Sequence, residues 1–186
     1  MDINFTFDKN HDIIIKLLLW QEVSNMEYKK IYKEFIKNNK YKKLSKENHH
    51  GTSRIEHINR VAKMSYGISK FLKLDYISTT RGALMHDFFL NDELDNLNAK
   101  RFKVHPEKAY ENASKYFEIN DTEKDIILSH MFPVTHKMPQ YKESHIVNLA
   151  DKVVSVYEFG RYQVKYTGAL AIVFTLELVN NVFKFI

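Results

Sequence analysis

Six residues that could bind a metal ion are spread over five segments, each of which has the apolar pattern of a buried helix face or helix end. They are His57, His86, Asp87, His105, His130 and Asp151. Any one of them alone would be interpreted as a core polar group that hydrogen-bonds to a neighbour. Burying six unpartnered imidazoles and carboxylates would cost several kcal/mol per group, and pairing does not readily satisfy all of them. One or two divalent cations coordinated by the whole set would remove that cost.

The donor atoms that the chain offers restrict the kind of metal. There is no cysteine, which excludes disulfides, thiolate metal sites and cysteine nucleophiles. Nitrogen and oxygen ligands suit one or two divalent ions of Fe, Mn, Co, Ni or Zn, and ligand type alone does not select among these metals. Helices that each point one or two such ligands inward form a known kind of metal site in helical proteins.

The elements that must position these ligands are helices. Only five glycines and three prolines occur in 186 residues, and apolar residues recur mostly every three or four positions, which predicts an all-α fold. Ser53 and Glu56 have the spacing of a capping box at the start of a helix that ends near Phe71. The inner face of this helix carries His57, Val61, Met64 and Ile68.

Two more helices and two connections flank that helix. The pattern predicts a lysine-rich amphipathic helix over residues 27–38 and a helix over 76–88 with His86 and Asp87 in its last turn. Residues 38–51 and 91–104 are polar and are expected to be a solvated connection and an irregular segment, respectively.

Three helices are expected in the second half. Pro106 suits the first position of a helix, which makes His105 its N-cap. Asp121 or Thr122 is expected to cap the next helix. The inner face of that helix carries Ile126, Ile127 and His130, and the inner face of the helix over 141–159 carries Val147, Asp151 and Val154.

Length indicates one main domain with an extension at each end. The expected division is an N-terminal helical extension at 1–47, a domain at 48–165 and an apolar C-terminal helix at 166–186. A membrane span needs about 20 apolar residues with few charges, and polar residues interrupt the last segment. A helix of the protein core is therefore the favoured hypothesis for this segment, and a membrane-associated tail is the alternative.

Charge and the first residues of the chain bear on partners and location. The formal net charge is +5, and lysine supplies nearly all of the positive charge. Arginine is the side chain that most often reads DNA bases, so an arginine-poor chain is not expected to have nucleic acid as a partner. The stretch MDINFTFDKN lacks the basic region of a signal peptide, which favours a cytoplasmic location.

The order of the candidate ligands resembles the HD-domain superfamily of metal-dependent phosphohydrolases. The segments SRIEHINRVA, ALMHDFFL, HPEKA, ILSHM and NLADK occur in family order, and the resemblance covers about residues 50–160. It implies a helical bundle with a metal site between helices, in which two metals share Asp87. The first metal would be completed by His57, His86 and Asp151, and the second by His105 and His130.

The same resemblance implies a reaction. A phosphoester of a nucleotide or another small phosphorylated metabolite would be hydrolysed by a metal-bound hydroxide, with His86 and Asp87 as the catalytic pair. Arg54, one helical turn before His57, and Lys152 are the candidates for contacting a substrate phosphate. A surface position is the alternative for Arg54, and a solvated flank is the favoured one for Lys152.

Departures from the family pattern keep the subfamily open. Many members continue the His-Asp pair with Ile-Gly and then Lys, whereas Phe88, Phe89 and Leu90 follow here. That lysine is usual in the cyclic-dinucleotide phosphodiesterase and diiron oxygenase branches. The Glu that often follows the pair in members acting on deoxynucleoside monophosphates is matched only out of frame, by Asp92 and Glu93. A diiron oxygenase and a non-catalytic metal- or ligand-binding module remain alternatives.

Other histidines are assigned no ligand role. The pair His11–Asp12 has no histidine a helix upstream to complete a site, and His136 lies in a loop bounded by prolines. The remaining histidines are expected in loops or at the surface: His49, His50 and His145.

Overall fold

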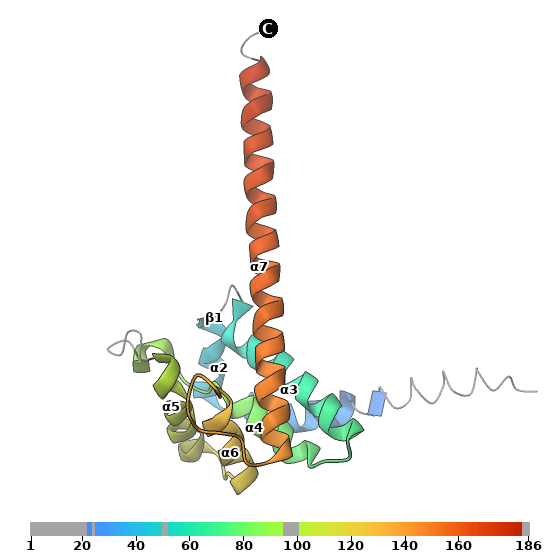
Figure 1. Cartoon of the computed structure of the whole chain (residues 1–186), viewed down its shortest axis with the longest axis vertical. Coiled ribbons are helices and arrows are strands. Elements are labelled where there is room, and N and C mark those ends of the chain that lie inside the picture. The colour runs from blue at the N-terminus through green and yellow to red at the C-terminus, as the bar shows by residue number, and fades with distance from the viewer. Residues whose placement is uncertain (1–21, 24, 50–51, 95–100, 184–186) are drawn as a thin grey trace, which may run out of the picture.

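The computed structural model describes residues 22–183 except 24, 50–51 and 95–100, and these residues form an all-α fold with one small hairpin. Residues 25–35 are helical. The elements that follow are α2 (Asn39–Lys43), the 3-10 helix η1 (Leu44–Lys46), β1 (Asn48–His49), β2 (Thr52–Ser53), α3 (Arg54–Phe71), α4 (Tyr76–Met85), α5 (Arg101–Tyr116), α6 (Asp121–Ser129) and α7 (Lys142–Phe183). The helical class expected from the sequence is confirmed (Figure 1).

Helix α3 begins where the sequence places it. The Ser53 side chain accepts a hydrogen bond from Glu56 N, which satisfies one of the free N–H groups of the first turn. His57 and Val61 are fully buried, while Met64 and Ile68 at the far end of the same face are partly buried. The buried face of α3 packs against α4 and α7.

Helix α4 ends one residue before the His-Asp pair. Asp75 caps its start by accepting hydrogen bonds from Ile77 N and Ser78 N, and His86 follows Met85 as the C-terminal cap. The prediction that His86 and Asp87 lie inside the last turn is therefore wrong by one to two residues. His86 and Asp87 form the turn that follows the helix, so both side chains lie at its C-terminal end.

The connection expected at 38–51 is not a solvated loop. It contains α2, η1 and β1, and β1 pairs antiparallel with β2. Tyr41 and Leu44 have no exposed surface, and the Tyr41 hydroxyl donates to the Leu84 carbonyl at 3.0 Å. Lys42, Lys43 and Lys46 are exposed, so the composition is polar although the segment is anchored in the core.

Two predicted helix starts in the second half are wrong. Helix α5 begins at Arg101, so Pro106 lies inside the helix and His105 in its second turn. Proline removes one backbone donor there, and the helix continues past it. Helix α6 is capped by Asn120, which forms a capping box with Glu123, one residue before the expected cap.

Helix α7 is one continuous helix of 42 residues. Its inner face is the predicted one, because Val147, Asp151 and Val154 are all buried. The boundary expected at residue 166 is not a break in the helix, and in Figure 1 the C-terminal end of α7 extends beyond the other elements. Within the described part of the chain, no helix is long and apolar enough to cross a membrane. Residues 1–21 of the expected N-terminal extension, with the pair His11–Asp12, lie outside the described residues.

Candidate metal centre

The structure brings all six candidate ligands together in the interior. His57 comes from α3, His105 from α5 and Asp151 from α7, whereas the other three follow the C-terminal ends of α4 and α6. None exposes more than 8% of its surface: His57, His86, Asp87, His105, His130 and Asp151. Five segments of the chain thus converge on one buried point.

The first group of ligand atoms surrounds His57 Nε2. Asp151 Oδ1 lies 3.1 Å from His57 Nε2 and 3.8 Å from His86 Nε2. One ligand atom each from His57, His86 and Asp87 lie within 4.8 Å of one another. These distances suit two imidazoles and two carboxylates that hold one cation.

The second group shares Asp87 with the first. His105 Nε2 and His130 Nε2 are 2.9 Å apart. Asp87 Oδ1 lies 3.4 Å from the former nitrogen and 3.6 Å from the latter, and the three ligand atoms again fall within 4.8 Å of one another. A carboxylate between two groups of imidazoles is the arrangement in which a single side chain can bridge two cations.

Hydrogen bonds on the far side of two imidazole rings fix which nitrogen faces the centre. His86 Nδ1 lies 2.7 Å from the Ala83 carbonyl, and His130 Nδ1 lies 2.8 Å from the Ile127 carbonyl. A carbonyl only accepts, so each Nδ1 carries the proton and, in the neutral ring, each Nε2 carries a lone pair. His86 Nε2 is fully buried without a hydrogen-bond partner. The Asp151 carboxylate, 3.8 Å away, also offers only lone pairs. A cation between these atoms resolves the conflict, so the residues fit a metal ion.

Electrostatics separate the two groups. Burial alone would lower the pKa of His57, but hydrogen bonds to Asp151 and Glu158 outweigh it and raise the pKa to about 9. Burial would raise the pKa of Asp151, but its hydrogen bond to His57 and the nearby imidazoles lower the pKa to about 2. Burial and the neighbouring histidines lower the pKa of His130 to about 3. The first group therefore favours a positive charge, and a metal ion would replace the His57 proton, whereas the second group offers neutral nitrogen.

Comparison with known proteins gives one match. A family model described as HD domain matches residues 54–155, more than half of the chain and the stretch that contains all six candidate ligands. The chain belongs to the HD-domain family. Neither the curated proteins nor the solved structures contain a match to it. The resemblance inferred from the sequence is confirmed, and the HD domain places this protein in a superfamily of metal-dependent phosphohydrolases.

Arg54 of this HD domain lies inside the protein. Only 3% of its surface is exposed, and its guanidinium lies 3.8 Å from the centre of the Phe89 ring. Its two terminal nitrogens donate to the Phe89 carbonyl at 2.6 Å and to Asn91 Oδ1 at 2.8 Å. Phe89 in turn packs on the His105 ring, with 5.2 Å between centroids. Arg54 thus supports the segment after the His-Asp pair, and its contact with a substrate stays a prediction.

Lys152 lies beside the second group of ligands. Its Nζ donates to the backbone carbonyls of His130 and Asn148, each at 3.2 Å. The side chain is half-buried, and burial lowers the pKa of its ammonium group. The solvent-facing alternative does not describe this lysine, and its role in substrate binding stays a prediction.

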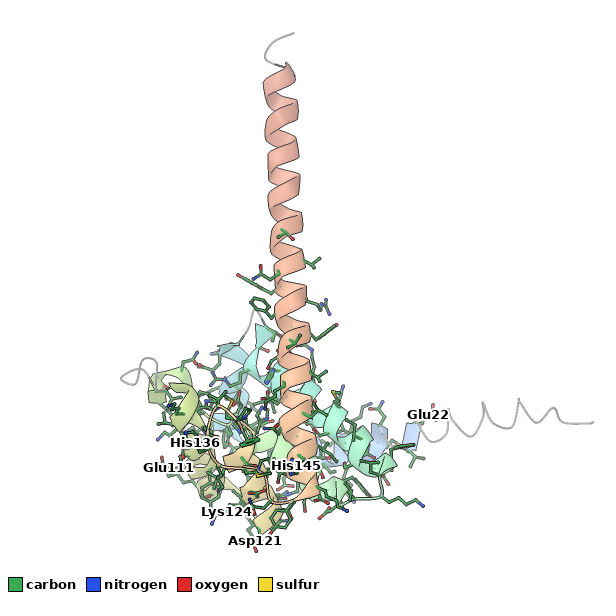
Figure 2. The ribbon with its side chains drawn as sticks, viewed as in Figure 1. Glu22, Glu111, Asp121, Lys124, His136 and His145 are labelled. Atoms are coloured by element: carbon green, nitrogen blue, oxygen red, sulfur yellow. The ribbon has the colours of Figure 1, made fainter. Side chains whose placement is uncertain are left out.

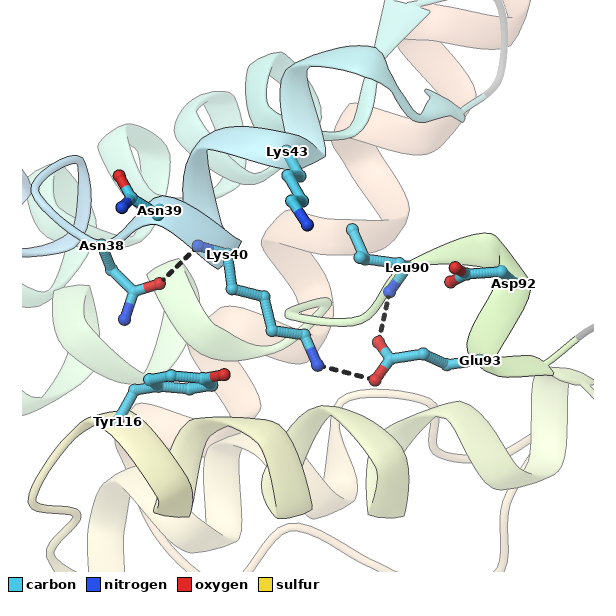
Figure 3. Close-up of a pocket in the computed structure, with 8 residues that line it drawn as sticks. All are labelled: Asn38, Asn39, Lys40, Lys43, Leu90, Asp92, Glu93 and Tyr116. Atoms are coloured by element: carbon cyan, nitrogen blue, oxygen red, sulfur yellow. Dashed lines mark hydrogen bonds and ion pairs between the residues drawn. The ribbon is translucent and has the colours of Figure 1, made fainter.

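The segment that departs from the family pattern is held by polar side chains to which the sequence analysis gave no supporting role. Asn112 Nδ2 donates to the Phe88 carbonyl at 3.0 Å, and Glu93 accepts from Leu90 N at 2.7 Å. Figure 3 shows Glu93 paired with Lys40 in a surface pocket, where the two charged atoms are 2.6 Å apart. None of the six candidate ligands lines this pocket. Glu93 is therefore an anchor of the segment after the pair.

Glu158 is the residue near the ligands that sequence reasoning missed. Its Oε2 lies 2.9 Å from His57 Nδ1. Its spacing of seven residues from Asp151 places both carboxylates on one face of α7, which is the signal that could have found it. Asp125 and Glu123 are also buried, but their contacts lie elsewhere, with Gln140 N and with Arg81 respectively.

The histidines that were assigned no ligand role lie outside both groups where the structure describes them. His136, in the loop before α7, and His145, in its first turn, are exposed at the surface (Figure 2). The side chain of His49 and the whole of His50 lie outside the described residues.

Proposed function

We propose that this HD-domain protein is a hydrolase that cleaves a phosphoester of a nucleotide or another small phosphorylated metabolite with the help of one or two divalent metal ions. The observation that carries the proposal is the meeting of imidazole lone pairs and carboxylate oxygens at one buried point, with His86 Nε2 left without a hydrogen-bond partner. The superfamily to which the HD domain belongs supports the reaction type.

The ligands would divide into two sets that share Asp87. His57, His86 and Asp151 complete the first set, and His105 and His130 complete the second. When bound, the ions supply Lewis-acid activation of water and neutralise charge that develops on the phosphoryl oxygens. Fe, Mn, Co, Ni and Zn all suit these donors.

The chain's own residues orient the ligands and limit the size of the substrate. The Ala83 and Ile127 carbonyls hold the rings of His86 and His130 with Nε2 toward the centre. Because none of the six ligands is more than 8% exposed, a small substrate fits the site better than a polymer. Lys152, next to the second set, is the better candidate for meeting a substrate phosphate, since it is only half-buried whereas Arg54 is 3% exposed.

The test combines metal analysis with a substrate screen on the full-length protein. We expect metal in the purified protein, hydrolysis of at least one phosphoester in a broad panel, loss of that activity on exhaustive chelation, and its return with Mn²⁺, Co²⁺, Ni²⁺ or Fe²⁺. Activity that persists in metal-free assays would contradict the mechanism. Iron-dependent oxygen uptake would instead identify a diiron oxygenase, and bound metal without turnover would identify a non-catalytic module.

A further inference from the structure

His57 lies between two carboxylates of the same helix. Asp151 Oδ1 is 3.1 Å from one ring nitrogen, Nε2, and Glu158 Oε2 is 2.9 Å from the other, Nδ1. The two acidic residues are seven positions apart on α7, about two helical turns, so their side chains leave the same face. Glu158 is therefore placed on the outer side of a ligand ring whose inner side faces the metal site.

Glu158 is itself held in place by a second residue of α3. Glu158 is only 4% exposed, and its Oε1 accepts a hydrogen bond from Arg60 Nη1 at 2.5 Å. Arg60 follows His57 by three residues, so both lie on the side of α3 that meets α7. A buried carboxylate needs such partners, and here one of its two oxygens is taken by the arginine and the other by the histidine.

We propose that Glu158 is a positioning residue of the metal centre. By accepting the Nδ1 proton of His57, it fixes the ring with Nε2 toward Asp151 and raises the basicity of that nitrogen, while Arg60 keeps the carboxylate in reach of the ring. A histidine ligand whose second nitrogen donates to a carboxylate is a general way to orient a metal ligand. This inference rests on the metal site of the proposed function and does not require the proposed reaction.

The experiment measures metal binding by the full-length protein, using Co²⁺ as the probe and a competing chelator to cover a wide range of affinity. Glu158→Ala should weaken Co²⁺ binding by about 10- to 100-fold, the range found for such supporting residues. The visible spectrum of bound Co²⁺ should also shift, because the orientation of one nitrogen ligand changes. Glu158→Gln keeps an oxygen that accepts from Nδ1, so it should recover part of the affinity.

Glu56→Gln is the matched control. It removes a carboxylate that also lies near Arg60, at 3.9 Å, but that is exposed at the surface. Its Co²⁺ affinity and spectrum should equal those of the wild type. Unfolding of the metal-free variants is recorded in parallel, since a purely structural role of Glu158 would lower stability and leave the affinity and spectrum unchanged.

The outcomes are distinct. Wild-type affinity and spectrum in Glu158→Ala would overturn the proposal. If the alanine variant does not fold, wild-type affinity and spectrum in Glu158→Gln would overturn it instead. A wild-type chain that binds no Co²⁺ would overturn this inference together with the proposed function. Normal Co²⁺ binding that depends on Glu158, without any phosphoester hydrolysis, would remove the proposed reaction alone.

Discussion

Asp87 is the residue on which both halves of the metal centre depend. It belongs to the group with His57 and His86 and to the group with His105 and His130. Its position in the turn after α4, two residues beyond the end of the helix, places the carboxylate within reach of both groups. The adjacency of a histidine and an aspartate is thus used to place two ligands at one helix end.

Substitution of Asp87 should therefore remove all metal. We expect Asp87→Ala to lose metal from both groups and to show no hydrolysis, as measured by metal stoichiometry per chain under one loading protocol. His105→Ala or His130→Ala should lose mainly the second metal. Removing a buried partner should also lower the stability of the metal-free protein by about 1–3 kcal/mol.

Asp12→Ala is the control for that experiment. It removes the aspartate of the other His-Asp pair, which has no histidine a helix upstream. Its metal content should equal that of the wild type. Full stoichiometry in Asp87→Ala, or loss of metal in Asp12→Ala, would mean that the wrong pair has been assigned to the site.

Arg54 offers a test between a supporting role and contact with substrate. Lysine in its place keeps the charge but cannot donate to both the Phe89 carbonyl and Asn91 Oδ1 in the fork geometry of a guanidinium. We expect Arg54→Lys to lower the free energy of unfolding by about 1–3 kcal/mol, as measured by denaturant titration. A rise in KM without any loss of stability would favour the substrate role instead.

At the scale of elements, α7 holds both halves of the site. It contributes Asp151 and Glu158 to the surroundings of His57, and two other residues of α7 bind the end of α6. Asn148 Nδ2 donates to the His130 carbonyl at 2.7 Å, and Lys152 Nζ donates to the same oxygen. The position of His130 therefore depends on the same helix that positions His57.

The packing of α4 on α6 can be tested at Gly82. A Cβ at this position would lie 2.7 Å from Ile126 Cδ1 and 2.9 Å from Ile126 Cγ2, which is closer than such atoms approach in proteins. Gly82→Ala should push apart the two helices that end at His86 and His130. We expect a loss of about 1–3 kcal/mol in the free energy of unfolding and weaker metal binding.

Gly67→Ala is the control, because it introduces the same methyl group inside α3. Nothing lies within 4 Å of a Cβ built there. Alanine is more favourable than glycine in a helix by about 0.5–1 kcal/mol, so this variant should be slightly more stable and should bind metal normally. A destabilised Gly67→Ala, or a Gly82→Ala variant as stable as the wild type, would contradict the packing described.

At the scale of the whole molecule, the metal site occupies only the first part of α7. Beyond Glu158, every side chain of α7 that the structure describes is exposed, and several are apolar, such as Phe159, 54% exposed, and Val164, 73% exposed. In Figure 1 the C-terminal end of the helix extends beyond the rest of the domain. The contacts that form the site thus end well before the apolar segment.

Deletion of residues 168–186 should therefore leave the metal site intact. We expect wild-type metal stoichiometry and an unchanged unfolding midpoint, because Asp151, Glu158 and the residues that contact them are all retained. Binding to lipid vesicles, followed by flotation of the intact and truncated chains, tests the membrane-associated hypothesis. Aggregation or loss of stability in the truncated protein would instead support the hypothesis of a core helix.

The sequence by itself determined the class of the fold and the identity of the candidate ligands. The 3.6-residue period is a local property, so the inner faces of α3 and α7 and the cap at Ser53 could be predicted from neighbouring residues alone. The order and spacing of the histidines and aspartates were enough to identify the family, and the match over residues 54–155 confirms it.

Only the tertiary structure decided which side chains meet. Tyr41 and Leu44 are buried in a lysine-rich segment because other helices cover them, and no local pattern reports that. The role of Glu158 depends on the distance between α3 and α7, which sequence spacing within α7 does not contain. Helix periodicity fixes the direction in which a side chain points, but its partner is set by the packing of helices that are distant in the chain.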